Sequence, residues 1–136
     1  MMKELTVDAA IENIPSVTAF VDEQLEQYNC PVKAQMQIDI AIDELFSNIA
    51  YYAYTPKSGK ATVRVEVTEN PMSVVITFID NGIPYDPLAK ADPDITKSAD
   101  EREIGGLGIF MVKKMATSVA YARTNNRNRL TVFKKL

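Results

Sequence analysis

The fold class is decided by residues 61–80, which read ATVRVEVTENPMSVVITFID. Apolar residues occupy every second position from Ala61 to Val67, which predicts a strand with one face toward water. The stretch 74–79 is denser in apolar residues, as expected of a central strand. Asn70 and Pro71 form the turn between them. Short turns of this kind join antiparallel strands, so the stretch predicts two neighbouring strands of an antiparallel sheet.

Upstream of these strands the sequence predicts one strand and two helices. A short strand at 4–7 is followed by a helix that begins near Pro15, where a missing N–H costs nothing, and ends near Gln27. A second, longer helix is predicted over 32–54.

Downstream, the periodic pattern disappears over 83–103, and a structureless segment of this length in a compact domain is usually functional. A helix is then predicted to about 117, followed by strands at 118–124 and 129–134 around an Asn-rich turn at 125–128. The complete order predicts an α+β fold, a two-layer sandwich in which a mixed, mostly antiparallel sheet carries its helices on one face.

Length and composition limit what the chain can be. Its 136 residues fit one domain, 1–136, and 15 Lys and Arg against 18 Asp and Glu give a net charge of −3, which disfavours nucleic-acid binding. No apolar run approaches the roughly 20 residues that span a bilayer. A single cysteine excludes an intrachain disulfide and favours a reducing, cytoplasmic location. The absence of histidine excludes a Ser-His-Asp triad and a histidine-based zinc site.

The second predicted helix carries two polar residues beside its apolar face. That face consists of Ile38, Ala41, Ile42, Leu45, Ile49 and Tyr52. Asp39 and Asp43 are predicted on the opposite side, toward solvent. Glu44 and Asn48, four residues apart, share a row along the edge of the apolar face. Such a pair is either a polar border of the core, or a site with an acid/base carboxylate beside an oxygen ligand for Mg2+.

Asp80 ends the predicted central strand in phase with its inward apolar residues, so its carboxylate is expected to point inward at the end of the sheet. Asn81-Gly82 alone would indicate a hairpin turn. Pro84 and Pro87 follow at once, however, and prolines do not begin a returning central strand. The turn is therefore expected to lead into a loop, which leaves Asp80 without a structural role.

Three of the five glycines lie in the segment Gly105-Gly106-Leu107-Gly108, at the start of the third predicted helix. Glycines that open a helix expose backbone N–H groups at the positive end of its dipole, which is an anion site. A flexible hinge is the other interpretation. The segment is no Walker P-loop, because no Gly-Lys-Ser/Thr follows, and a preceding loop disfavours a Rossmann fingerprint.

Taken together and in this order, these segments resemble the GHKL ATPase superfamily over 33–134. The segment 41–48 resembles its N box, 80–87 its first glycine box and 105–110 its second. Within this superfamily, the residues of these three segments are most similar to those of bacterial anti-sigma regulatory factors with serine/threonine protein kinase activity. The resemblance implies the Bergerat ATP-binding fold.

The resemblance also implies roles for individual residues. Asp80 would bind the adenine amino group, with Gly82 letting the base approach the backbone, and Asn48 would hold Mg2+. The amides of 105–108, around Gly106 and Gly108, would receive the phosphates of ATP, under a lid formed by about 83–105. Glu44 would be the general base for a partner's serine or for water. All of this requires Asp80 and Asn48 to line one cavity with room for a nucleotide.

The implied function is that of a Mg-ATP-dependent anti-sigma factor. It would bind a sigma factor in one state and phosphorylate a small anti-sigma antagonist in another, as a homodimer without direct contact to nucleic acid or membrane. One alternative is a binding module that holds ATP and sequesters a partner with little phosphate transfer. Another is an interaction domain without nucleotide.

Two positions depart from the family pattern. Pro84 replaces the second glycine of Asp-x-Gly-x-Gly, and Tyr52 stands where better-known anti-sigma kinases tend to carry histidine. These changes bear on the start of the lid and on sigma-factor specificity more than on nucleotide binding. Cys30, next to a helix start, is either a reactive thiol or a small helix-flanking residue.

Overall fold

The computed structural model of the protein describes residues 2–89 and 107–136. Five strands form one sheet in the order β1-β2-β3-β5-β4, and every neighbouring pair is antiparallel. The strands are β1 (Met2–Asp8), β2 (Lys60–Thr68), β3 (Ser73–Asp80), β4 (Ser118–Thr124) and β5 (Arg127–Lys135).

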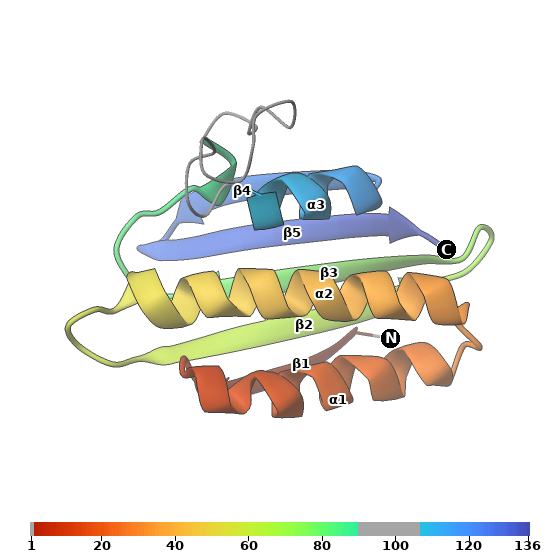
Figure 1. The fold of residues 1–136 in the computed structure, drawn as a ribbon, viewed down its shortest axis with the longest axis horizontal. Helices are drawn as coiled ribbons and strands as arrows, with labels where there is room; N and C mark the ends of the chain where they lie inside the picture. The colour runs from red at the N-terminus through yellow and green to blue at the C-terminus, as the bar shows by residue number, and fades with distance from the viewer. Residues whose placement is uncertain (1, 90–106) are drawn as a thin grey trace.

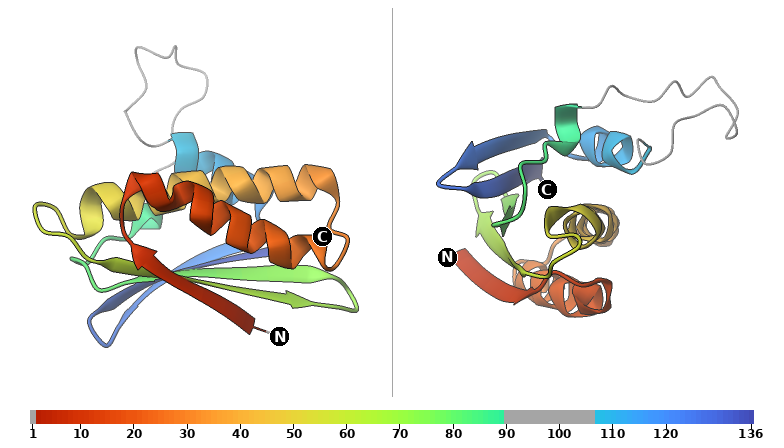
Figure 2. Two further views of the ribbon diagram at one scale, coloured as in Figure 1. Left: turned by 90° about the horizontal axis from the view of Figure 1, so that it is seen from below. Right: turned by 90° about the vertical axis from the view of Figure 1, so that its left-hand side faces the viewer.

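Within the described residues, three α-helices are present, and they cover one face of this sheet, as both views of Figure 2 show. They are α1 (Ile14–Glu26), α2 (Val32–Asn48) and α3 (Leu107–Met115), and α2 lies between the other two (Figure 1). Three shorter elements are η1 (Ile11–Asn13), η2 (Ile49–Ala53) and η3 (Pro87–Ala89). The predicted two-layer α+β sandwich is confirmed.

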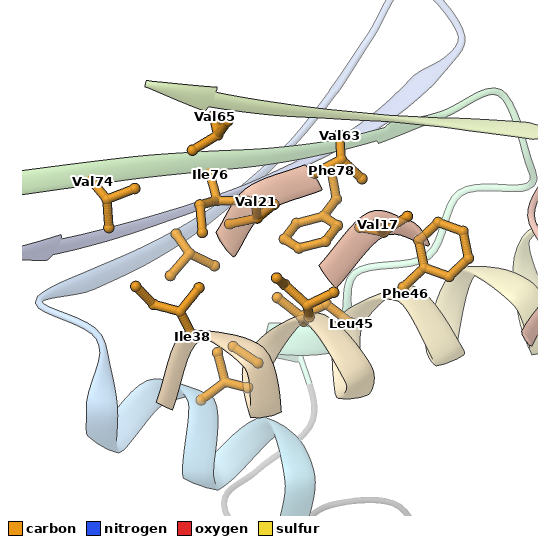
Figure 3. Close-up of a cluster of buried hydrophobic side chains, with 14 of the residues drawn as sticks. Val17, Val21, Ile38, Leu45, Phe46, Val63, Val65, Val74, Ile76 and Phe78 are labelled. Atoms are coloured by element: carbon orange, nitrogen blue, oxygen red, sulfur yellow. The ribbon is translucent and has the colours of Figure 1, made fainter. Parts of the chain in front are cut away.

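The core fills the space between α1, α2 and the inward faces of β2 and β3 (Figure 3). Every second residue of β2 faces the helices, which confirms the predicted alternation. The fully buried large side chains in this layer include Val17, Val21, Leu25, Ile38, Ile42, Leu45, Phe46, Val63 and Val65. Truncating Phe46 or Leu45 would therefore leave a cavity in the centre of the protein.

The second helix differs from its prediction at the C-terminal end. The α-helix stops at Asn48, and the chain continues as the π-helical turn η2. A π-helical turn holds more residues than an α-helical one, so it rotates the following side chains out of the apolar row. Tyr52, predicted on the apolar face, is accordingly 52% exposed, and that prediction was wrong.

The turn between β4 and β5 is shorter than predicted. Asn125 and Asn126 both have positive φ, 52° and 60°, as in the two-residue turns that match the twist of antiparallel strands. The strand therefore begins at Arg127, and Asn128 belongs to β5 rather than to the turn.

Asp39 does not face solvent, and that prediction was also wrong. Asp39 Oδ1 on α2 and Asp22 Oδ1 on α1 are both shielded from water, and neither has a hydrogen-bond partner within the part of the chain that the structure describes. Burial, reinforced by the Asp22 side chain, raises the pKa of Asp39 to about 7. Asp39 therefore keeps its proton to a higher pH than an exposed aspartate does. The helical periodicity of the sequence predicts the direction in which Asp39 leaves α2. It does not predict that α1 packs against α2 on that side.

This pair predicts a pH-dependent stability. The pKa of Asp39 is higher in the folded protein than in the unfolded chain, so folding is favoured at low pH and loses that contribution as pH rises from about 4 toward 7. Asp39→Asn supplies a hydrogen-bond donor to Asp22 and removes this loss. Because both groups keep partial contact with water, the expected gain is roughly 1 kcal/mol, or about 2–5 °C in melting temperature at pH 8.

Melting curves of Asp39→Asn at pH 5 and pH 8 check this expectation, with Asp43→Asn as the control because Asp43 is exposed one turn further along α2. The gain should appear at pH 8 and shrink at pH 5. An equal shift for both variants, or none at pH 8, would show that the raised pKa of Asp39 does not limit the stability of the protein.

No helix in the described ranges, 2–89 and 107–136, combines the length and apolar character needed to cross a bilayer.

Candidate functional site

A cavity lies where the C-terminal end of α2 and η2 meet the end of β3 and the loop that follows it. Its volume is about 30 Å3, enough for a few water molecules. It is lined by Leu45, Asn48, Ile49, Ala53, Phe78, Asp80, Tyr85, Pro87, Tyr121, Asn128 and Leu130. A mostly apolar wall with a few convergent polar groups is typical of a small-molecule site. Asp80 and Asn48 thus line one cavity, but at this volume the cavity does not have the room for a nucleotide that the sequence-based prediction requires.

Asp80 is held in a fixed orientation at the end of β3. It is only 6% exposed, and its Oδ1 accepts hydrogen bonds from the Gly82 N–H and from Asn128 Nδ2, both at 2.9 Å. Both bonds use the same oxygen. Oδ2 therefore remains as the carboxylate acceptor that can serve a ligand in the cavity.

Asn128 is a site residue that sequence reasoning missed. It lies opposite Asp80 in the β3–β5 register and is 6% exposed. Its Nδ2 donates to Asp80 Oδ1 and, at 2.7 Å, to the Ile83 carbonyl, while its Oδ1 accepts from the Tyr85 N–H and the Tyr121 hydroxyl. The available signal was its phase with the inward residues Leu130 and Val132, which the Asn-rich turn obscured.

The loop after Asp80 is fixed by further hydrogen bonds and does not return as a hairpin strand. Besides the Gly82 N–H bond to Asp80, the Gly82 carbonyl accepts from Arg123 Nη1 at 2.8 Å, and the Ile83 N–H donates to the Ala53 carbonyl at 2.9 Å. A Cβ at Gly82 would overlap the Ala53 carbonyl. The missing side chain of Gly82 therefore lets the loop approach η2. The structure shows this role for Gly82, and the predicted approach of the adenine base stays a prediction.

Gly82→Ala should for this reason shift the loop away from η2. Relieving the overlap with the Ala53 carbonyl is expected to cost about 1–3 kcal/mol, which lowers the melting temperature by several degrees and weakens ligand binding at Asp80. Asn81→Ala is the matched control, because Asn81 is the exposed neighbour. Equal melting temperatures for Gly82→Ala and the unaltered protein would contradict this account of the contact.

Glu44 lies on α2, one turn before Asn48. Its carboxyl group is close to Gly108 at the start of α3. Glu44 is half-buried, and a Cβ at Gly108 would overlap its carboxyl group, so the missing side chain of Gly108 lets α3 approach α2 here. Burial raises the pKa of Glu44, and the neighbouring Asp43 adds to this, while a hydrogen bond from the Asn48 side chain acts in the opposite direction. A carboxylate with a raised pKa is suited to take up a proton.

Tyr85 lies near Glu44 at the edge of the site and contacts a second tyrosine, Tyr52. The rings of Tyr52 and Tyr85 lie 5.6 Å apart between centroids, in a tilted arrangement. Burial raises the pKa of Tyr85, and Tyr52 and Glu44 contribute to the shift. Tyr85 also lines the cavity, so the loop after β3 closes it on this side.

The remaining predicted residues are described only in part. Leu107 begins α3, and Gly108 contacts Glu44. Gly105, Gly106 and most of the predicted lid, 83–105, lie outside the described residues. Cys30 is buried, and burial raises the pKa of its thiol, which favours the helix-flanking interpretation over a reactive thiol.

The antiparallel sheet with helices on one face is the fold of the GHKL ATPase superfamily. The chain belongs to the histidine kinase-like ATPase domain family, whose profile matches residues 7–134. Membership in an ATPase family implies ATP as the ligand.

Similar proteins include kinases. The serine/threonine-protein kinase BtrW of Bordetella bronchiseptica is 26% identical over 100 residues, which cover 74% of this chain and 70% of BtrW. The RsbU and RsbW domains of Rv1364c from Mycobacterium tuberculosis align with a TM-score of 0.71 and 18% identity over 100% of this chain, which spans only 32% of that one.

A second structural neighbour is the SiaB-SiaC complex from Pseudomonas aeruginosa, with a TM-score of 0.59 and 15% identity over 97% of this chain and 89% of the matched chain. At these identities the two structural likenesses show the fold alone.

Proposed function

We propose that the protein is a Mg-ATP-dependent serine/threonine kinase that phosphorylates a small anti-sigma antagonist and binds a sigma factor. One observation carries the proposal: Asp80 and Asn48 line one cavity, and Glu44 lies one helical turn before Asn48, whose side chain acts to lower the pKa of Glu44. The similarity to BtrW, which is named as a serine/threonine-protein kinase, supports the choice of reaction.

In this proposal Asp80 selects adenine. Its Oδ2 would accept a hydrogen bond from the exocyclic amino group, while Leu45, Phe78 and Leu130 provide apolar contacts to the base. The cavity of about 30 Å3 is too small for a purine. Binding would therefore require the loop that carries Tyr85 and Pro87 to move outward and enlarge the cavity.

Asn48 fits the role of a magnesium ligand. Magnesium prefers oxygen donors, and Asn48 brings an amide oxygen to the wall of the cavity. When bound between Asn48 and the phosphates, Mg2+ would supply charge neutralisation for phosphate transfer. Asn48 would thus position both the metal and the carboxylate.

Glu44 would act as the general base. The substrate's hydroxyl proton would pass to the Glu44 carboxylate as the hydroxyl oxygen bonds to the γ-phosphorus and ADP leaves. No histidine is needed for this reaction, because phosphate transfer depends chiefly on positioning and charge stabilisation.

The test is a phosphate-transfer assay. The protein is incubated with γ-labelled ATP, Mg2+ and a candidate antagonist encoded beside its gene, with and without EDTA. Metal-dependent label on a serine or threonine of the antagonist supports the kinase. Retained ATP without transfer would instead support the ATP-holding, partner-sequestering module, and absence of ATP binding would leave an interaction domain. Mass measurement of the same sample tests the expected homodimer.

A further inference from the structure

The outward side of α2 is apolar, although the solvent side of a surface helix is normally polar. Val32, Met36 and Ile40 are 74%, 61% and 59% exposed. Their spacing of four residues places them in one row along the helix. The row therefore forms a continuous apolar strip on the side of α2 that points away from the sheet.

The strip continues onto α3. A groove of about 210 Å3 separates the two helices and is lined by Gln37, Ile40, Ala41, Met111, Val112, Lys114 and Met115. On the α3 side of the groove, Met111 is 53% exposed. Figure 1 shows α3 alongside α2 on the helical face of the protein. Val32, Met36, Ile40 and Met111 are called the α2–α3 platform below.

The platform ends at Glu44. Ile40 precedes Glu44 by one turn, about 6 Å along the helix axis, and Val32 by about 18 Å. On the other helix, Met111 follows Gly108 by one turn, and Gly108 abuts the Glu44 carboxyl group. A molecule lying on the platform would therefore reach Glu44 with one end, and the length of the strip suits a protein surface rather than a small ligand.

Charges differ between the two ends of the platform. Lys33 and Lys114 are exposed on the half of the platform away from Glu44, and neither forms an ion pair with another described residue. On the α1 side of the same half, Glu26 is exposed beside Val32 and Met36. Asp43 is exposed at the Glu44 end. A partner that complements this surface carries acidic groups over the lysines and an uncharged group, such as a hydroxyl, at Glu44.

We propose that the α2–α3 platform docks the protein substrate of the kinase. The substrate is a folded domain with an apolar contact surface, acidic groups facing Lys33 and Lys114, and the acceptor hydroxyl at the end that meets Glu44. This inference rests on the proposed function. The nucleotide cavity lies on the sheet side of α2, so nucleotide and protein substrate approach Glu44 from different directions.

The test uses charged substitutions on the platform in the complete chain. Ile40→Glu with Met111→Glu should raise the KM for the antagonist at least about 10-fold and leave ATP affinity and acceptor-free ATP hydrolysis unchanged. Ile40→Gln with Met111→Gln is a milder pair in case the charged pair fails to fold. Ile11→Glu is the matched control, since Ile11 is 39% exposed in η1, outside the platform. Lys33→Glu with Lys114→Glu should weaken transfer to the same acceptor and reduce its salt dependence.

Unchanged KM in both platform pairs overturns the docking proposal while the kinase proposal stands. If the protein is a dimer and only the double substitutions at Ile40 and Met111 convert it to a monomer, the docking proposal is also overturned. The platform would then bind a second copy of the chain. No transfer by the unaltered protein, with or without ATP binding, counts against the proposed function itself.

Discussion

Glu44→Gln is expected to lower phosphate transfer about 10²–10⁴-fold while ATP binding is retained. Glutamine has nearly the same shape as glutamate, so it fits the narrow space beside Gly108 but cannot accept the substrate's proton. Initial rates of phosphate transfer and equilibrium ATP binding, measured on the same preparation, separate the chemical step from binding.

Asp43→Asn is the control for this substitution, because it removes the neighbouring exposed carboxylate and leaves Glu44 in place. The pH profile adds a second readout. Burial raises the pKa of Glu44, so transfer by the unaltered protein should increase as the pH rises through that pKa, and this dependence should be lost in Glu44→Gln. Equal rates of phosphate transfer for Glu44→Gln and the unaltered protein would exclude Glu44 as the base.

Asp80→Asn is expected to weaken ATP binding. The new side chain can still accept from the Gly82 N–H and from Asn128 through one oxygen, so the loop keeps its anchor. The other carboxylate oxygen becomes an amide N–H2 group, which cannot accept from the adenine amino group. Loss of a charge-assisted hydrogen bond of about 1.5–3 kcal/mol corresponds to a roughly 10–150-fold weaker affinity for ATP.

Calorimetric titration with ATP and Mg2+ measures this loss, and melting curves without nucleotide check that Asp80→Asn is folded. Asp86→Asn is the matched control in the same loop, because Asp86 Oδ1 accepts from the Leu88 N–H and can still do so as an amide. If both variants bind ATP as the unaltered chain does, Asp80 does not contact the base.

The layers of the fold could be predicted because alternation in β2 and the apolar row of α2 follow directly from which side chains are buried. Asp39 and Tyr52 could not be placed in the same way. Periodicity gives an angle on a helix but does not show that α1 packs beside Asp39. It also assumes α-helical geometry, which the π-helical turn before Tyr52 breaks.

The candidate site was predictable to the extent that its residues lie in phase with buried neighbours. Asp80 follows the inward row of β3, and Asn48 follows Glu44 by one helical turn. Asn128 was predicted to lie in a turn, because residues 125–128 include three asparagines. Only Asn125 and Asn126 form the turn in the structure. The volume of the cavity depends on how Tyr85 and Pro87 pack against it, and no local pattern carries that information.

The central claim is that a carboxylate in this cavity recognises adenine, and equilibrium binding of ATP and GTP to the unaltered protein in Mg2+ tests it most directly. Guanine presents a carbonyl oxygen where adenine presents its amino group, so GTP would place an acceptor against Asp80. The account predicts that ATP binds at least about 10-fold more tightly than GTP. Equal affinities for the two nucleotides, or no measurable affinity for ATP, would contradict it.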